Sequence, residues 1–167
     1  VEYCVNTGKI TYDLATYQNK AECAVGGIVG FISPYSAGVV DKTLVGNTVI
    51  RNCYNSGIFY FNMGANVVGN ALYWGGILGG ANSLSKATNK IENCYNLHAL
   101  RKGENGIAAN VSGNNYRFGG LLGVYWIDGN KPDVGVLEVL NSSSVEIDVV
   151  GYNGTNLCRY WIRNNKD

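Results

Sequence analysis

An eight-residue motif occurs four times in this chain of 167 residues and limits the possible folds more than any other feature of the sequence. Three clear copies occupy residues 1–8, 50–57 and 91–98, and a weaker copy occupies residues 136–143. Their starts lie 49, 41 and 45 residues apart. Repetition at a period of this size is typical of solenoids and related repeat architectures.

A second motif alternates with the first. It consists of a large apolar residue, a Gly-Gly pair, two further apolar residues and a final glycine, and its copies occupy residues 25–30, 74–79 and 118–123. The Gly-Gly pair begins 25, 25 and 28 residues after the start of its repeat. Two motifs in constant order and at nearly constant offsets indicate that each repeat is one structural unit stacked on the next.

The repeats predict an all-β chain, specifically a right-handed parallel β-helix (β-solenoid). We expect each repeat of about 41–49 residues to form two coils of roughly 20 to 25 residues each. In the first motif, the apolar first residue and the cysteine at position four point inward from a short strand. Repeats starting near residues 1, 50, 91 and 136 would fill residues 1–143. Residues 144–167 would be a degenerate coil or cap of the same domain.

Asparagine follows the cysteine position by two residues in each clear copy. We expect these side chains to turn the chain and to stack as a ladder of amide hydrogen bonds. The predicted ladder consists of Asn6, Asn55, Asn96 and Asn141. Gly8 and Gly57 supply a second turn position, which His98 occupies in the third copy; histidine is among the residues enriched at positive φ.

Composition excludes several partners. A formal net charge of +1, from 13 Lys and Arg against 12 Asp and Glu, gives no basic face for nucleic acid or anionic membrane. No apolar run approaches the roughly 20 residues of a membrane span, so we expect no membrane insertion in this segment. The chain shows neither an initiator methionine nor a signal peptide, which suggests that it is part of a longer protein.

The second motif resembles the GLUG-motif repeats of bacterial surface proteins. Residues 120–123 (Gly-Leu-Leu-Gly) match that signature literally, and residues 27–30 and 76–79 match with isoleucine in the leucine place. The Asn-Cys-Tyr-Asn stretches at 52–55 and 93–96 look like the companion sequence of such repeats. The resemblance implies a β-helical stalk or binding region of a large secreted or cell-surface protein, such as an adhesin or the non-catalytic part of an IgA-protease-like enzyme.

The sequence predicts no catalytic residue, no cofactor and no metal site. His98 is the only histidine, and no zinc-ligand pattern surrounds it. Cys4, Cys53 and Cys94 recur at an inward position and are expected to pack as small apolar side chains. Cys23 and Cys158 fall outside the repeat pattern, and a disulfide between them is possible. The stretch 128–133 has the residues of either a plain turn or a calcium loop, and Lys131 favours the turn.

Tyrosines remain as candidates for ligand contact. Six of them lie in or beside the segments of variable length, where an aromatic ring with a polar tip suits recognition of a host glycan or protein. They are Tyr12, Tyr17, Tyr35, Tyr60, Tyr116 and Tyr125. The alternative is that they cover strand surfaces. We therefore expect a non-catalytic segment that binds a ligand or acts as a stalk. Alternatives are a subunit that self-associates through its solenoid ends and the non-catalytic region of a large secreted protease.

Overall fold

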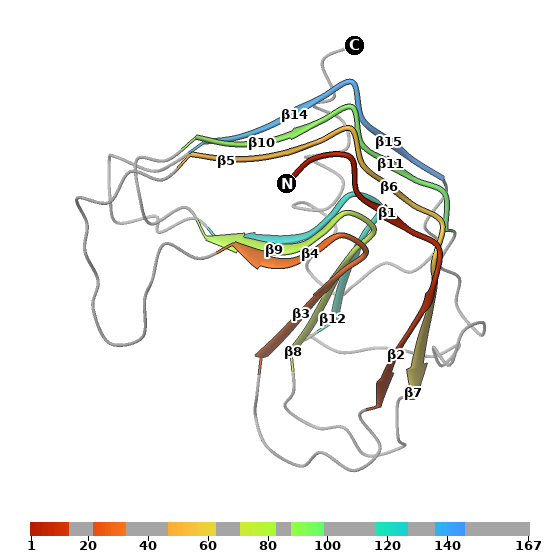
Figure 1. Ribbon diagram of the computed structural model, residues 1–167. Helices are drawn as coiled ribbons and strands as arrows, with labels where there is room; N and C mark the ends of the chain where they lie inside the picture. The colour runs from red at the N-terminus through yellow and green to blue at the C-terminus, as the bar shows by residue number, and fades with distance from the viewer. Residues whose placement is uncertain are drawn as a thin grey trace.

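The computed structural model describes residues 1–13, 22–32, 47–62, 71–82, 88–98, 116–126 and 136–145. Within these residues the protein is all-β, with strands and turns and no helix. Every pairing between strands is parallel. Figure 1 shows the strands lying in stacked layers, with strands from distant parts of the sequence side by side.

Fifteen strands form five sheets in the described part of the chain. One sheet has the order β1-β6-β11-β15, from Val5–Asn6, Tyr54–Asn55, Tyr95–Asn96 and Ser143–Ser144. A second has the order β14-β10-β5, from Val136–Leu140, Thr88–Glu92 and Thr48–Arg51. A third has the order β12-β8-β3, from Tyr116–Gly119, Ala71–Gly75 and Glu22–Gly26. The fourth is β13-β9-β4, from Leu122–Trp126, Leu78–Asn82 and Val29–Ile32, and the fifth is β2-β7, from Lys9–Asp13 and Ile58–Asn62.

No sheet takes more than one described strand from a repeat, and equivalent strands of successive repeats lie next to each other. We call the strands of one repeat a tier: β1–β4, β5–β9, β10–β13 and β14–β15. Tyr54 of the second tier pairs with Val5 below it and Tyr95 above it. The prediction of two coils per repeat is therefore wrong for the described residues. Two coils would place the second motif of a repeat between consecutive copies of the first, whereas first-motif strands pair directly with each other.

The register also corrects the alignment of the weakest repeat. Val139, not Val136, lies opposite Ile91, which in turn lies opposite Ile50. The fourth repeat thus starts three residues later than the sequence predicts. With this alignment, residues 141–144 (Asn-Ser-Ser-Ser) correspond to residues 93–96 (Asn-Cys-Tyr-Asn).

Two regions of different composition enclose the core. In the aliphatic arm, β5, β10 and β14 face β4, β9 and β13, and the side chains between them are mostly Ile, Leu and Val. In the aromatic arm, β2 and β7 face β3, β8 and β12. There the rings of Phe59 and Trp74 lie 4.9 Å apart and those of Phe61 and Phe118 lie 5.6 Å apart, both edge to face. The sheet that contains β1, β6, β11 and β15 joins the two arms (Figure 1).

The Gly-Gly pair forms the inner corner between the two arms. A Cβ on Gly75 would lie 1.9 Å from the carbonyl oxygen of Leu78, so the chain turns more tightly there than a side chain allows. A Cβ on Gly76 would lie 2.2 Å from the side-chain amide carbon of Asn96. Both glycines are thus required by close approach of backbone or amide atoms. The second glycine brings the corner directly against the asparagine side chains.

Candidate functional site

The asparagine side chains form a continuous ladder through the stack. Asn6 Nδ2 donates to Asn55 Oδ1 at 2.9 Å, and Asn55 Nδ2 donates to Asn96 Oδ1 at 2.9 Å. Both Asn55 and Asn96 are fully buried. Each Oδ1 also accepts a backbone N–H two residues on, from Gly8, Gly57 and His98 respectively. The amide groups of these side chains are occupied by hydrogen bonds that stabilise the corner, so the ladder is structural.

Asn141 is not a member of this ladder. Asn96 Nδ2 instead donates to Ser144 Oγ at 3.0 Å, because Ser144 is the residue in register with Asn96. Asn141 stands at the position of Asn52 and Asn93, where φ lies between 44° and 55°. Asparagine suits this left-handed conformation. At that position Asn93 Nδ2 donates to Asn52 Oδ1 at 3.1 Å.

The repeated thiols also have a structural role. Each Sγ donates to the carbonyl oxygen two residues earlier, at 3.4 Å in Cys4, 3.1 Å in Cys53 and 3.2 Å in Cys94, and Ser142 Oγ does the same at 2.8 Å. Burial raises the pKa of the Cys94 thiol to about 11. A thiol of that pKa stays protonated at neutral pH and is a poor nucleophile. Cys23 is a free thiol, and its possible partner Cys158 lies outside the described residues.

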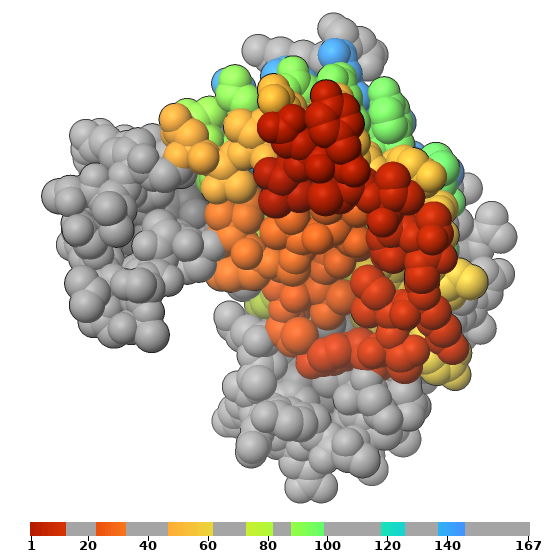
Figure 2. Space-filling view, in the orientation of Figure 1, coloured from red at the N-terminus to blue at the C-terminus, as the bar shows by residue number. Residues whose placement is uncertain are grey.

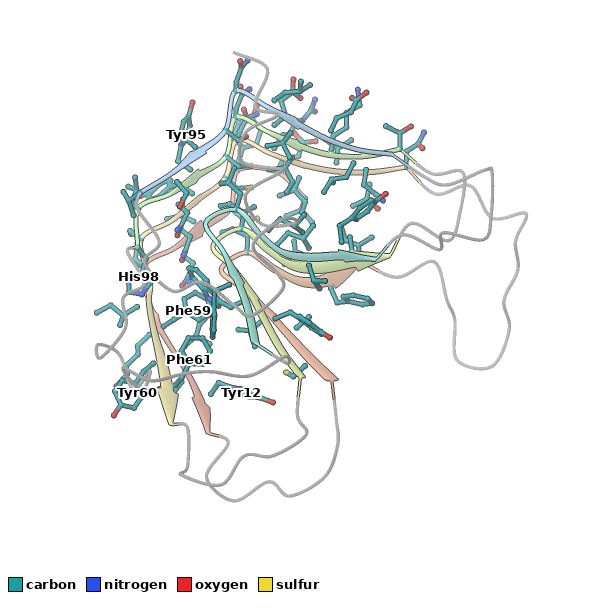
Figure 3. The ribbon with its side chains drawn as sticks, turned by 180° about the vertical axis from the view of Figure 1, so that it is seen from behind. Tyr12, Phe59, Tyr60, Phe61, Tyr95 and His98 are labelled. Atoms are coloured by element: carbon teal, nitrogen blue, oxygen red, sulfur yellow. The ribbon has the colours of Figure 1, made fainter. Side chains whose placement is uncertain are left out.

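His98 caps the aromatic arm. It lies beside Phe59 (Figure 3), and its Nε2 accepts the backbone N–H of Phe59 at 3.3 Å. The His98 ring lies 6.2 Å from that of Phe59 and 6.3 Å from that of Trp74. Burial lowers the pKa of His98, which favours the neutral ring that this acceptor role needs. The backbone N–H of His98 donates to Asn96 Oδ1, as those of Gly8 and Gly57 donate to their own asparagines. The positive φ expected at this position is absent, since the described non-glycine residues with positive φ are Tyr3, Asn52, Asn93 and Asn141.

No group of three or more His, Cys, Asp or Glu side chains among the described residues is placed to hold a metal ion. The stretch 128–133 lies outside them. Exposed ion pairs join neighbouring tiers, among them Arg51 with Glu2 and Lys90 with Glu138, both at 2.9 Å. The hydrogen bond that Arg51 donates lowers the pKa of Glu2, and the hydrogen bond that Lys90 donates to Glu138 raises the pKa of Lys90. The described part of the chain contains no helix long and apolar enough to cross a membrane.

An exposed apolar surface runs along the outside of the joining sheet and of β7. From residue 53 to residue 61 burial alternates without exception, with odd-numbered residues inside and even-numbered residues outside. We call the following exposed side chains the outer aromatic face: Val5, Tyr54, Ile58, Tyr60, Tyr95 and Leu97. Tyr54 is 39% exposed and Tyr95 45%, and they are register partners in adjacent strands. Lys9 Nζ lies 4.8 Å from the centre of the Tyr60 ring, a cation–π distance.

Among the predicted contact tyrosines whose side chains the structure describes, only Tyr60 lies on this face. Tyr125 is 2% exposed and belongs to the core of the aliphatic arm, which contradicts a role in ligand contact. Tyr12 is half-buried and in register with the buried Phe61, so it belongs to the inner side of its sheet (Figure 3). Tyr17 and Tyr35 lie outside the described residues, as does the side chain of Tyr116.

Tyr54 and Tyr95 were not among the predicted contact residues, because only tyrosines outside the repeated motif were considered as candidates. The signal that would have found them is alternation. In the sequence Cys-Tyr-Asn, an inward cysteine and an inward asparagine require the tyrosine between them to point outward.

No protein-family model, curated protein or solved structure matches the chain.

Proposed function

We propose that this chain is a non-catalytic, right-handed β-solenoid segment of a bacterial secreted or cell-surface protein, and that it binds a host glycan or protein through the outer aromatic face. Its resemblance to GLUG-motif repeats belongs to this proposal. The observation that carries it is the register of Val5, Tyr54 and Tyr95, which places apolar and aromatic side chains in one row across three tiers. His98 and the repeated thiols of Cys4, Cys53 and Cys94, which would otherwise suggest chemistry, are engaged in structural hydrogen bonds.

The chemistry of the face suits a carbohydrate or a polar protein surface. Tyrosine rings offer flat apolar area for the C–H face of a sugar, and their hydroxyl groups remain available at the rim. Thr7, Ser56 and Lys9 add polar groups on the same side. Tyr54, Tyr60 and Tyr95 come from paired strands rather than from loops, which fixes the backbone that carries them and lowers the ordering cost of binding.

A panel of immobilised glycans and host proteins, probed with the purified segment, tests the proposal. The double variant Tyr54→Ala/Tyr95→Ala should weaken binding to any recognised ligand by about tenfold or more, the equivalent of about 1.4 kcal/mol. Lys90→Ala, on the outside of a different sheet, is the matched control and should bind like the wild type. Equal binding by the double variant would show that the outer aromatic face is not the contact surface.

Two alternatives give different results. A stalk without a ligand of its own would bind nothing on the panel yet still unfold cooperatively. A self-associating subunit would form concentration-dependent assemblies through the ends of the stack. A third possibility, the non-catalytic region of a secreted protease, predicts a metalloprotease motif elsewhere in the full-length protein.

A further inference from the structure

The two ends of the stack differ in how well their inward side chains are covered. Three inward positions of the first tier, Cys4, Val25 and Val29, have an equivalent residue in the second and third tiers. All of these equivalents are buried: Cys53 and Cys94, Trp74 and Phe118, Leu78 and Leu122. In the first tier Cys4, Val25 and Val29 remain partly exposed. In the last tier Leu137, Val139 and Ser142 are buried again. The first tier forms the face toward the viewer in Figure 2, in red and orange.

The backbone of the first tier is open in the same direction. Tyr54, Ser56 and Ile58 of the second tier donate their N–H groups to Cys4, Asn6 and Gly8 of the first. The equivalent residues of the first tier are Val5, Thr7 and Lys9, whose N–H groups therefore point out of the stack. They constitute an unpaired parallel edge, which is a template for another strand.

The space around Gly30, compared with that around the equivalent glycines of later tiers, indicates what could occupy this edge. A Cβ on the equivalent Gly79 would lie 2.5 Å from the carbonyl oxygen of Gly30, and one on Gly123 would lie 2.4 Å from that of Gly79. In both cases the preceding tier excludes a side chain. A Cβ on Gly30 would meet nothing closer than the carbonyl oxygen of Ala24 at 3.4 Å, and its φ is not in the left-handed region. Nothing within the described chain requires glycine at this position, but a preceding tier would.

From these observations we infer that the open end of the first tier is a docking edge for one more tier of the same repeat type, with an asparagine at its inner corner. The ladder runs from Nδ2 of one tier to Oδ1 of the next, so the incoming asparagine would donate to Asn6 Oδ1. Backbone of the incoming tier would lie over Gly30. The inference rests on the stacked architecture proposed above, but not on the outer aromatic face.

A second copy of this chain is a poorer occupant. Its last tier places Ser144 at the ladder position, where Ser144 Oγ already donates to the carbonyl oxygen of Val145. At the ladder position that end therefore presents a serine hydroxyl rather than an amide donor for Asn6. Its inward side chains are already covered, so stacking on it would bury little further apolar surface.

The test compares two chains, the protein itself and an extended protein in which a copy of residues 50–90 is fused ahead of Val1. Gly30→Ala should change the melting temperature of the original chain by less than about 2 °C, and Gly79→Ala should lower it by about 5 °C or more. In the extended chain Gly30→Ala should become as damaging as Gly79→Ala. The extension should also slow alkylation of Cys4 by tenfold or more.

Three outcomes would overturn the inference. Gly30→Ala could be equally damaging in both chains, which would give the glycine a local reason. The extension could leave Cys4 alkylation unchanged, which would mean that the added tier does not dock. Sedimentation could show the original chain dimerising with Cys4 protected, which would make a second copy the occupant. Gly79→Ala tests the stacked architecture separately, since it should destabilise both chains whatever occupies the edge.

Discussion

The two arms of the molecule are built from the same repeat but differ in how far an inward residue varies from tier to tier. In the aliphatic arm one inward row carries nearly the same residue in three tiers, Ile50, Ile91 and Val139. In the aromatic arm the residue changes between tiers, from Val25 to Trp74 to Phe118. Small branched side chains can stack at the spacing of adjacent strands, about 4.8 Å. Rings that meet edge to face need a neighbour of a particular shape, so the aromatic arm is specific to each tier.

Exchanging residues between tiers gives the largest expected effect. Leu78→Val introduces the residue of the first tier into the aliphatic arm and should cost about 1 kcal/mol of unfolding free energy. Trp74→Val does the same in the aromatic arm and should cost about 4 kcal/mol, because a large cavity opens beside Phe59. Denaturant unfolding of both variants measures the difference. Equal costs would remove the distinction between the arms.

Loss of the asparagine ladder should give the next largest effect, since the ladder lies at the corner that joins the arms. Asn55→Leu leaves the Asn6 amide and the Gly57 N–H without their acceptor and removes one of the two hydrogen bonds to Asn96 Oδ1, and should cost about 3 kcal/mol. Asn55→Ser, which introduces the residue type found at Ser144, should cost less because a hydroxyl can both donate and accept. Denaturant unfolding again measures both costs. If both variants unfold like the wild type, the ladder contributes nothing to stability.

Acid should weaken the aromatic arm through His98. The pKa of His98 is lowered in the folded protein, so the unfolded chain binds the proton more readily. The contribution of neutral His98 to the free energy of unfolding is complete above the pKa of the unfolded chain, about 6.5. It is lost as the pH falls from there toward the pKa of the folded protein, by at most about 1.4 kcal/mol per pH unit. His98→Gln keeps an acceptor for the Phe59 N–H but does not titrate. The difference in stability between wild type and this variant should therefore change as the pH falls below about 6.5. A difference in stability that does not change with pH would contradict the role assigned to neutral His98.

The smallest predicted effect is a gain. Asn89 is buried on the inner side of the aliphatic arm, opposite Thr48 and Leu137, and its Oδ1 has no hydrogen-bond partner. Asn89→Leu removes a desolvated polar atom and should stabilise the protein by about 1 kcal/mol. Thermal unfolding checks the sign. A loss of stability would mean that the Asn89 amide makes an interaction the structure does not show.

The repeated elements were easier to predict from the sequence than their neighbours. Parallel β-structure, the inward cysteines and three members of the ladder follow from residue types at fixed positions. The number of coils per repeat does not, because a period in the sequence says which segments are equivalent but not which segments lie side by side. Asn141 was misplaced because the fourth repeat has serine at both the cysteine and the asparagine positions, which left only Asn141 as an anchor for the alignment.

The candidate site was harder to predict than the fold. Tyr125 was expected at the surface, yet Leu122 and Tyr125, three residues apart, both pack into the aliphatic core. The two-residue alternation of a regular strand does not hold in β13, and nothing in the local sequence signals that break. By contrast, the outward position of Tyr54 and Tyr95 follows from strict alternation.

The stacked fold requires that one repeat form one tier, and nuclear Overhauser contacts in the isotope-labelled protein test this most directly. We predict contacts from the side-chain amide of Asn55 to those of both Asn6 and Asn96, with backbone contacts between Tyr54 and Tyr95. If each repeat instead formed two coils, an intervening strand would separate these residues by about 9.6 Å, twice the strand spacing. Absence of these contacts, with strong backbone contacts between the strands of the first and second motifs of one repeat, would contradict the structure.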